Sequence, residues 1–246
     1  MGGVLPMFYF RTKYIFPVIL SLGIAALAAV MFLGESRQVF SETEKVRTVS
    51  TVVIDAGHGG DDGGTVGRSG TVEKDINLEI ALMTRRFCDY LGVDTVLTRE
   101  ADVSLGTGDT LREKKVSDLK NRVELVRSIE GAALISIHQN YYDDRVSRGA
   151  QVFYREGNLW GKALALRMQD DLACISGTEN TRRAMPLPNG NYMLENLDCP
   201  AIIVECGFLS HLEEEMLLNS PEYRGKLAFA VAAEALRCVS EGVAAG

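Results

Sequence analysis

Residues 51–91 read TVVIDAGHGGDDGGTVGRSGTVEKDINLEIALMTRRFCDYL. Residues 51–55 are apolar and β-branched enough to form a buried strand, and the glycines after them predict a turn. Further on, apolar side chains recur at spacings of four, three, four and four, which predicts an amphipathic helix over residues 75–91. A strand, a glycine-rich turn and a helix in this order are typical of layered α/β domains.

The same alternation continues along the chain, with strands predicted at 95–98, 134–138, 150–154 and 201–205. Helices are predicted around Leu119–Ile129, at 159–172 and at 223–239, and residues 100–117 read as a polar loop. With 246 residues, 46% of them hydrophobic, the chain can bury one good-sized core. We therefore expect an α/β fold with a twisted, mostly parallel central sheet flanked by helices, in one main domain over residues 48–240.

The beginning of the chain has a different character. Arg11 and Lys13 precede an uncharged run of twenty residues, 14–33, which is long enough to span a bilayer. We expect residues 1–33 to be a membrane anchor or, alternatively, a cleaved signal peptide, and residues 34–47 to be a linker. In both cases the two positive charges stay on the cytoplasmic side, so the domain is expected to be exported.

Charge and cysteine content exclude several functions. A net charge of -7 argues against binding to nucleic acid, which depends on clustered lysine and arginine. The five cysteines form no CxxC pair and are expected to be small core residues. Cys206 invites a nucleophile hypothesis, but no histidine-containing motif pairs with it by spacing.

Polar residues follow the predicted strands. His58 comes after the strand at 51–55, His138 ends the strand at 134–138, and Glu205 ends the strand at 201–205. Carboxyl ends of parallel strands are where open α/β sheets gather ligands. Together with Glu73, just before the first helix, the two histidines supply the three protein ligands of a catalytic Zn²⁺ site, and a fourth position is left for water.

This ligand set predicts a hydrolase that cleaves an amide bond, because zinc lowers the pKa of a bound water to roughly 7 and polarises a carbonyl. Glu205 would act as the general base and then the general acid. Cobalt or manganese would also suit these ligands. Each residue has a simpler explanation as well: a turn residue for His58, a helix-dipole carboxylate for Glu73, a core histidine for His138, and half of an ion pair for Glu205.

Taken together, the motifs VVIDAGHGGDDGG, GTVEKDINLEIA, VLTRE, NRVELV, LISIHQN, SRGAQVFY and VECGFLSH resemble the zinc-dependent N-acetylmuramoyl-L-alanine amidases of bacteria. By position, the resemblance implies that His58, Glu73 and His138 are zinc ligands and that Glu205 is the catalytic glutamate. The implied substrate is peptidoglycan, cut between N-acetylmuramic acid and the L-alanine of its stem peptide.

For the substrate, we expect Arg99 and Arg122 to bind stem-peptide carboxylates, because guanidinium groups pair with carboxylates through two parallel bonds. Asn140 and Gln151 are further candidates. Arg182 and Arg183 are open to the same role or to a solvated loop surface.

The segments NTRRAMPLP and NYMLENLDCPAIIVECGF are similar to those of the sporulation amidases. That resemblance implies a role in spore cortex maturation, muramic-lactam formation and germination, in the forespore intermembrane space, beside an activating or downstream cortex-modifying protein. Three alternatives remain open: another exported zinc hydrolase, a non-catalytic wall-binding protein, and an enzyme that is inactive until it meets a partner. In the third case, residues 100–117 or 176–191 would be the controlled element.

Overall fold

The structure, a computed structural model, describes residues 46–175, 180–188 and 191–245. The described residues all belong to one compact unit, Lys45–Gly246. The predicted membrane segment at residues 14–33 lies outside the described residues. Among the helices that are described, none has both the length and the apolar character that a membrane crossing requires.

The unit Lys45–Gly246 is built on a central sheet. Within the described residues, six strands lie in the order β3-β2-β4-β7-β5-β6. Their bounds are β2 (Thr51–Ala56), β3 (Thr95–Leu97), β4 (Ala132–Asn140), β5 (Gln151–Tyr154), β6 (Met185–Pro186) and β7 (Ala201–Phe208). The first four strands of that order run parallel, whereas β5 is antiparallel to β7 and parallel to β6. The predicted mostly parallel sheet is therefore confirmed, with a reversed pair at one edge.

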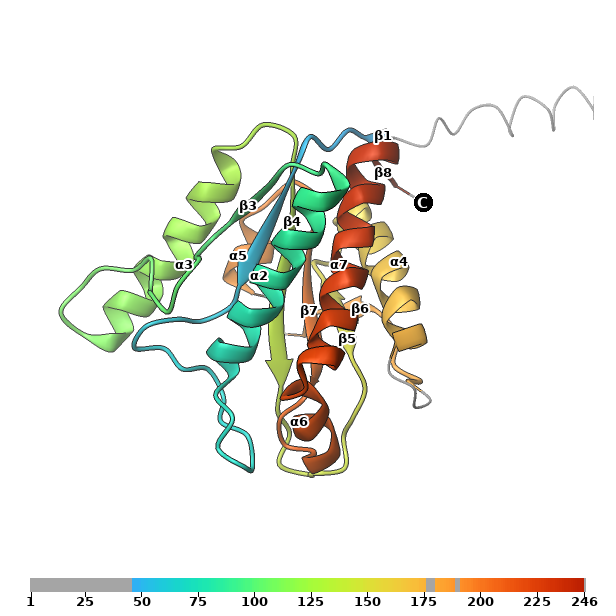
Figure 1. Cartoon of the computed structure of the whole chain (residues 1–246). Helices are drawn as coiled ribbons and strands as arrows, with labels where there is room; N and C mark the ends of the chain where they lie inside the picture. Colours follow the sequence, from blue (N-terminus) through green and yellow to red (C-terminus); the bar gives the residue numbers. More distant parts are fainter. Residues whose placement is uncertain (1–45, 176–179, 189–190, 246) are drawn as a thin grey trace, which may run out of the picture. The chain divides into compact units, whose positions relative to one another are not determined.

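Helices cover both faces of this sheet. Their bounds are α2 (Glu73–Leu91), α3 (Leu111–Arg127), α4 (Leu159–Ile175), α5 (Tyr192–Glu195), α6 (Leu212–Leu218) and α7 (Pro221–Glu241). Alternate residues of a strand point to opposite faces, so Ile54 packs in the larger core cluster with α2, α4 and α7. Its neighbour Val53 packs in the smaller cluster with α3 and α5. Figure 1 shows α2 and α7 side by side on the first of these faces.

Helix α3 begins earlier than the apolar pattern predicted. It starts at Leu111, within the residues expected to form a polar loop. Thr110 accepts a hydrogen bond from the backbone N–H of Glu113, and the Glu113 side chain accepts one from the backbone N–H of Thr110. This reciprocal capping stabilises a helix start without any apolar periodicity. A threonine followed three residues later by a glutamate therefore marks the start of α3, which the hydrophobic pattern did not show.

The folded unit also extends past the predicted boundaries of 48 and 240. β1 (Val46–Arg47) pairs antiparallel with β8 (Val243–Ala244). Val243 is fully buried in the larger core cluster. The last residues of the predicted linker therefore belong to the domain, because they form backbone hydrogen bonds with its C-terminal strand.

Candidate active site

Three predicted site residues form one row across the sheet. His138 on β4 is the Cα partner of Glu205 on β7, and Glu205 is the Cα partner of Gln151 on β5. The row lies on the face covered by α3 and α5, because Ile203, two residues before Glu205, packs in that cluster. Gly57 continues the row beyond β2, and a Cβ atom there would lie 2.3 Å from the His138 ring. Glycine at this position is what leaves room for the histidine.

The row does not lie at the strand ends. β4 continues to Asn140 and β7 to Phe208, with a register shift between His138 and Asn140. The sequence predicted His138 and Glu205 as the last residues of their strands. The strands extend further because the residues after them, although less regular, still pair with each other.

His58 is held in a demanding backbone conformation. Its φ of 64° is in the left-handed region, which costs a residue with a side chain about 1–2 kcal/mol. The Arg122 guanidinium donates a hydrogen bond to the His58 carbonyl oxygen at 2.7 Å. On the ring, Nδ1 lies 3.0 Å from Oδ2 of Asp62. A neutral imidazole that donates from Nδ1 to this carboxylate presents the lone pair of Nε2 to a metal ion.

Glu73 is the first residue of α2 and follows the loop that leaves His58. Its Oε2 accepts a hydrogen bond from the backbone N–H of Thr65 at 2.9 Å, and its Oε1 accepts one from the backbone N–H of Gln139 at 3.1 Å. Gly64 lies so close that a Cβ atom there would be 2.6 Å from Oε2. The Glu73 carboxylate is therefore fixed from two segments that are distant in the sequence.

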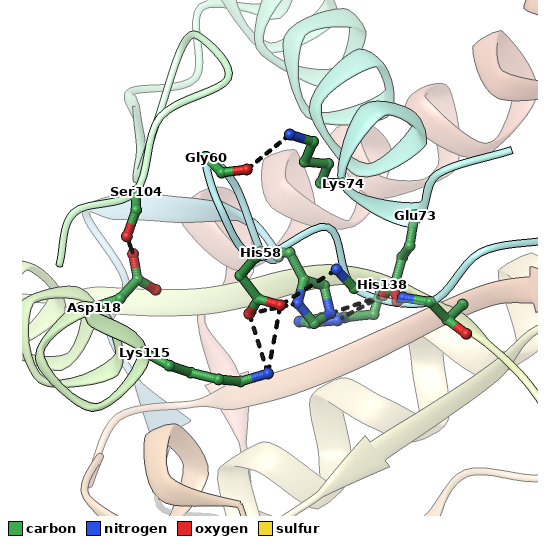
Figure 2. Close-up of polar contacts among 12 residues, drawn as sticks. His58, Gly60, Glu73, Lys74, Ser104, Lys115, Asp118 and His138 are labelled. Atoms are coloured by element: carbon green, nitrogen blue, oxygen red, sulfur yellow. Dashed lines mark hydrogen bonds and ion pairs between the residues drawn. The ribbon is translucent and has the colours of Figure 1, made fainter. Parts of the chain in front are cut away.

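The three predicted ligands point toward one another (Figure 2). Oε1 of Glu73 lies 3.2 Å from Nε2 of His58 and 3.1 Å from Nδ1 of His138, and one ligand atom from each residue lies within 4.8 Å of the others. Tetrahedral zinc with bonds of 2.0–2.1 Å places its ligand atoms about 3.3 Å apart, so the two distances from Glu73 to the histidines suit this ion. His58, Glu73 and His138 therefore lie together, and the donor set suits Zn²⁺.

The electrostatics of the site favour a cation. Burial alone would lower the pKa of His58, but the carboxylates of Asp62 and Glu73 raise it to about 9. Burial alone would raise the pKa of Glu73, but His138 and His58 hold it well below its usual range. The site therefore keeps Glu73 ionised and stabilises positive charge at the His58 ring, whether a proton or a metal ion carries that charge.

Glu205 is half-buried beside this centre, and its Oε2 is buried without a hydrogen-bond partner among the described residues. Desolvation raises its pKa to about 7, against an opposing effect of His138. A carboxyl group with such a pKa can take up and release a proton near neutral pH. Its neighbour Cys206 is completely buried, and burial raises the pKa of that thiol, so it is a poor nucleophile.

Two residues expected to bind substrate have a structural role instead. Arg99 is 3% exposed and donates hydrogen bonds to the carbonyl oxygens of Ala56, Gly57 and Lys74. Arg122 is 1% exposed, and its guanidinium donates to Asp55, to Asp118 and to two backbone carbonyls. The expectation that these arginines bind stem-peptide carboxylates is corrected, because their donors are already engaged in holding the His58 loop.

The other two candidates differ from each other. Asn140 is half-buried, and its Oδ1 accepts a hydrogen bond from the backbone N–H of Tyr141, so substrate binding by its amide stays a prediction. Gln151 is buried. Its side chain donates to the Arg183 carbonyl oxygen at 3.0 Å and accepts from Arg182 at 2.8 Å. Both ends of the Gln151 amide therefore already have protein partners, and substrate binding by this residue stays a prediction.

Sequence reasoning missed several supporting residues. Asp62 orients His58 from four residues away, and Asn77 donates to the Gly57 carbonyl oxygen and to Glu73, also four residues away. Both spacings were visible in HGGDD and EKDIN. Glu215 on α6 accepts hydrogen bonds from the backbone N–H groups of Ser69 and Thr71, which fixes the loop before α2. No sequence pattern near Glu215 predicts this role.

A cavity of about 170 Å³ opens beside the two histidines. It reaches from the sheet to α3 and to the start of α5, and its lining comprises Asp55, Gly57, His58, Asp62, Lys115, Asp118, Leu119, Arg122, Ser136, His138, Asn191, Met193 and Ile203. Substrate thus has access to the ligand cluster from the α3 side of the sheet.

A largely parallel sheet that carries a His–Glu–His cluster with a half-buried carboxylate beside it suits a hydrolase, and the cluster could hold a metal ion. Comparison with known proteins gives the family. Residues 52–237 match the model of the N-acetylmuramoyl-L-alanine amidase family, and the chain belongs to that family. It is therefore an enzyme, a peptidoglycan amidase.

Individual relatives agree. The germination-specific N-acetylmuramoyl-L-alanine amidase of Bacillus subtilis is 35% identical over 192 residues, which are 77% of this chain and 80% of the relative. The structure of the CwlD amidase from Clostridioides difficile in complex with the GerS lipoprotein matches with a TM-score of 0.74 and 35% identity, over 78% of this chain and 98% of that one. The catalytic domain of CwlV from Paenibacillus polymyxa gives a TM-score of 0.64 at 28% identity, over 77% of this chain and 97% of that one.

Proposed function

We propose that this amidase depends on zinc, held by His58, Glu73 and His138, and that it cleaves the bond between N-acetylmuramic acid and the L-alanine of the stem peptide. The observation that carries the proposal is the spacing of the three ligand atoms, within 4.8 Å of one another, beside a carboxylate in the paired strand. Zinc bound there would acidify the attacking water and polarise the scissile carbonyl.

Glu205 is the residue we propose for proton transfer. Its carboxylate takes a proton from the attacking water, whose oxygen joins the carbonyl carbon. The same proton then passes to the leaving nitrogen as the carbon–nitrogen bond breaks. The products are the carboxylate of the muramic acid lactyl group and a stem peptide with a free amino group on L-alanine. Among the described residues, Oε2 has no hydrogen-bond partner, which supports this role because a structural carboxylate would have its oxygens satisfied.

Digestion of purified peptidoglycan tests both parts. The full-length protein is incubated with peptidoglycan, and the soluble products are identified by mass spectrometry. Zinc-loaded wild type should release free stem peptides and leave the glycan intact, whereas a chelated sample and Glu205→Gln should release none. Glu213→Gln is the matched control, since this exposed glutamate lies on α6 away from the cluster. Release of stem peptides by Glu205→Gln at the wild-type rate would refute the role of Glu205.

We further propose that the enzyme acts in spore cortex maturation. The support is the likeness to the germination-specific amidase of Bacillus subtilis. In this proposal residues 14–33 anchor or export the protein, which places the amidase on the wall side of the membrane. Spores from cells that lack the gene should then contain little muramic lactam and germinate poorly. Unchanged muramic lactam would leave the amidase activity standing and remove the cortex role.

A lipoprotein partner is part of this proposal, because the CwlD amidase was solved in complex with the GerS lipoprotein. Purification of the tagged full-length chain from sporulating cells should recover a lipoprotein in a constant ratio. Adding that lipoprotein to the purified amidase should raise the rate of stem-peptide release. Full activity without any partner would remove this part of the proposal and leave the cleavage reaction unaffected.

A further inference from the structure

An arginine on the β5 side of the site has no task in the reaction described above. Arg182 belongs to residues 180–188, and its guanidinium carbon lies 4.4 Å from the centre of the Phe208 ring. Its Nε donates to the Arg148 carbonyl oxygen at 2.6 Å and its Nη1 donates to Oε1 of Gln151 at 2.8 Å. Within the described part of the chain, Nη2 has no partner. The side chain is half-buried, so a preorganised guanidinium retains donors for a ligand.

The place of this guanidinium relative to the catalytic centre follows from the sheet. Gln151, to which it is bonded, is the third residue of the row that begins with His138 and continues with Glu205. Neighbouring strands lie about 4.8 Å apart, so the His138 and Gln151 backbones are separated by about 10 Å. Arg182 therefore lies at the Gln151 end of the row, and Glu205 lies between it and the metal ligands.

Charge is distributed unevenly on the two sides of the centre. On the α3 side, Lys114 pairs with Asp61 at 2.6 Å and Lys115 pairs with Asp62 at 3.2 Å, so both lysines are neutralised. The whole chain carries a net charge of -7. A region of unpaired positive charge beside the site is therefore an exception to the charge of the protein as a whole.

On the Arg182 side, Arg148 and Arg183 add two exposed guanidinium groups. The nearby carboxylate of Asp144 already accepts hydrogen bonds from Ser147 and from the backbone N–H of Val146. Another carboxylate, Glu214, is buried and accepts from two backbone N–H groups. Hydrogen bonds do not remove the charge of Asp144, which interacts electrostatically with Arg182. The three guanidinium groups of Arg148, Arg182 and Arg183 still outnumber these two carboxylates, which suits an anion.

Only one half of the substrate supplies an anion. The lactyl carboxyl of N-acetylmuramic acid is consumed in the scissile amide, so the glycan beside it is neutral. The stem peptide carries free carboxylates, the first of them on its second residue, a glutamate linked through its side chain. Two extended residues span about 7 Å, and the carboxylate itself adds about 2 Å. This reach agrees with the separation between the metal ligands and the end of the row.

We propose that Arg182 binds the α-carboxylate of the second stem-peptide residue and thereby selects glutamate over its amidated form. The inference rests on the proposed cleavage between N-acetylmuramic acid and L-alanine, with the scissile carbonyl at the His58, Glu73 and His138 cluster. Phe208 and Gln151 hold the guanidinium in place. Arg182 is therefore a specificity-determining residue.

The test uses two soluble muramoyl peptides that differ in one group, a free α-carboxylate or a carboxamide on the second residue. KM and kcat are measured for both with the full-length wild type, Arg182→Gln, Arg182→Lys and the control Arg183→Gln. A lost charge-assisted hydrogen bond should raise the KM of Arg182→Gln for the carboxylate substrate by about 10- to 100-fold, with kcat little changed. On the carboxamide substrate its KM should change by less than about threefold. Arg182→Lys should recover part of the preference for the carboxylate substrate over the carboxamide substrate. Arg183→Gln should keep all of this preference.

Each other outcome overturns the proposal in a distinct way. If Arg182→Gln raised KM equally for both substrates, Arg182 would only support the local fold around Gln151 and Phe208. The same selective rise in KM for Arg183→Gln would assign the preference to the summed charge and not to one bound guanidinium. If the wild type releases no stem peptide even from intact peptidoglycan, the proposed cleavage itself fails. That result differs from a failure of the Arg182 proposal alone, in which the wild type still cleaves but the variants show no selective change in KM.

Discussion

Replacing Asp55 by asparagine should strongly destabilise the protein, because this residue carries the charge at the centre of the site's supporting network. Asp55 is the last residue but one of β2 and is 1% exposed. Its carboxylate accepts hydrogen bonds from Arg122, from Oγ1 of Thr98 at 2.7 Å and from Oγ of Ser136 at 2.5 Å. Asparagine keeps the shape, but it removes the charge that faces the buried guanidinium.

The magnitude follows from two independent considerations. Removing one partner of a buried ion pair costs about 3–5 kcal/mol, and the lower end applies because Arg122 keeps a second carboxylate in Asp118. Burial alone would raise the pKa of Asp55, but Arg122 and the hydroxyl groups lower it from 3.8 to about 2. A shift of that size corresponds to roughly 2–3 kcal/mol. We therefore expect Asp55→Asn to lower the free energy of unfolding by about 3 kcal/mol, and Tm by about 6–12 °C.

Urea and thermal denaturation of the wild type and Asp55→Asn measure this difference. The matched control is Asp61→Asn, which breaks the solvent-exposed pair with Lys114 and should leave Tm nearly unchanged. A loss below about 1 kcal/mol for Asp55→Asn would contradict the claim that the buried pair holds the end of β2 and the His58 loop together.

The difference in free energy of unfolding between the wild type and Asp55→Asn should depend on pH. Because the folded-state pKa of Asp55 is depressed from 3.8 to about 2, its contribution is complete above pH 3.8 and is lost as pH falls through about 2. The stability gap between wild type and Asp55→Asn should accordingly narrow between pH 5 and pH 2. A gap that stays constant over this range would mean that folding leaves the pKa of Asp55 unchanged.

Two further substitutions test the support of the metal ligands. Asp62→Asn removes the charged acceptor for Nδ1 of His58 and should weaken zinc affinity by about 10- to 100-fold in a chelator competition assay; an unchanged affinity would show that the ring needs no such orientation. Gly67→Ala places a Cβ atom 2.3 Å from Oε1 of the buried Glu215 and should destabilise the protein by about 1–3 kcal/mol in urea denaturation. Gly63→Ala is its control, since the nearest atom to that Cβ is 3.4 Å away, and equal effects of the two would remove the packing argument.

Much of the fold could be predicted from the sequence because each element carries its own hydrophobic period. The buried run before His58 and the spaced apolar residues after Glu73 correspond to β2 and α2 within two residues. The meeting of the two histidines was predictable for a related reason, since residues in or after the carboxyl-terminal part of neighbouring parallel strands reach the same side of a sheet. The place of Glu73 beside them depends on the loop that leads into α2.

What could not be predicted depends on pairing between distant residues. The direction of β5 has no signature in its four residues, yet its reversal is what brings Gln151 beside Glu205. The arginine side chains were misassigned for the same reason, because the carboxylate that holds Arg122 is 67 residues away. A sequence shows that an arginine is present, but its burial and its partners are set only by the complete packing.

Titration of the zinc-free full-length protein with Zn²⁺, following both bound metal and stem-peptide release, tests the central claim most directly. We expect one tight zinc ion per chain, with activity rising in proportion to occupancy. Glu205→Gln should bind zinc with the wild-type stoichiometry and release no peptide, and His138→Ala should lose both. Full activity without zinc, or a Glu205→Gln protein that cleaves at the wild-type rate, would contradict the account.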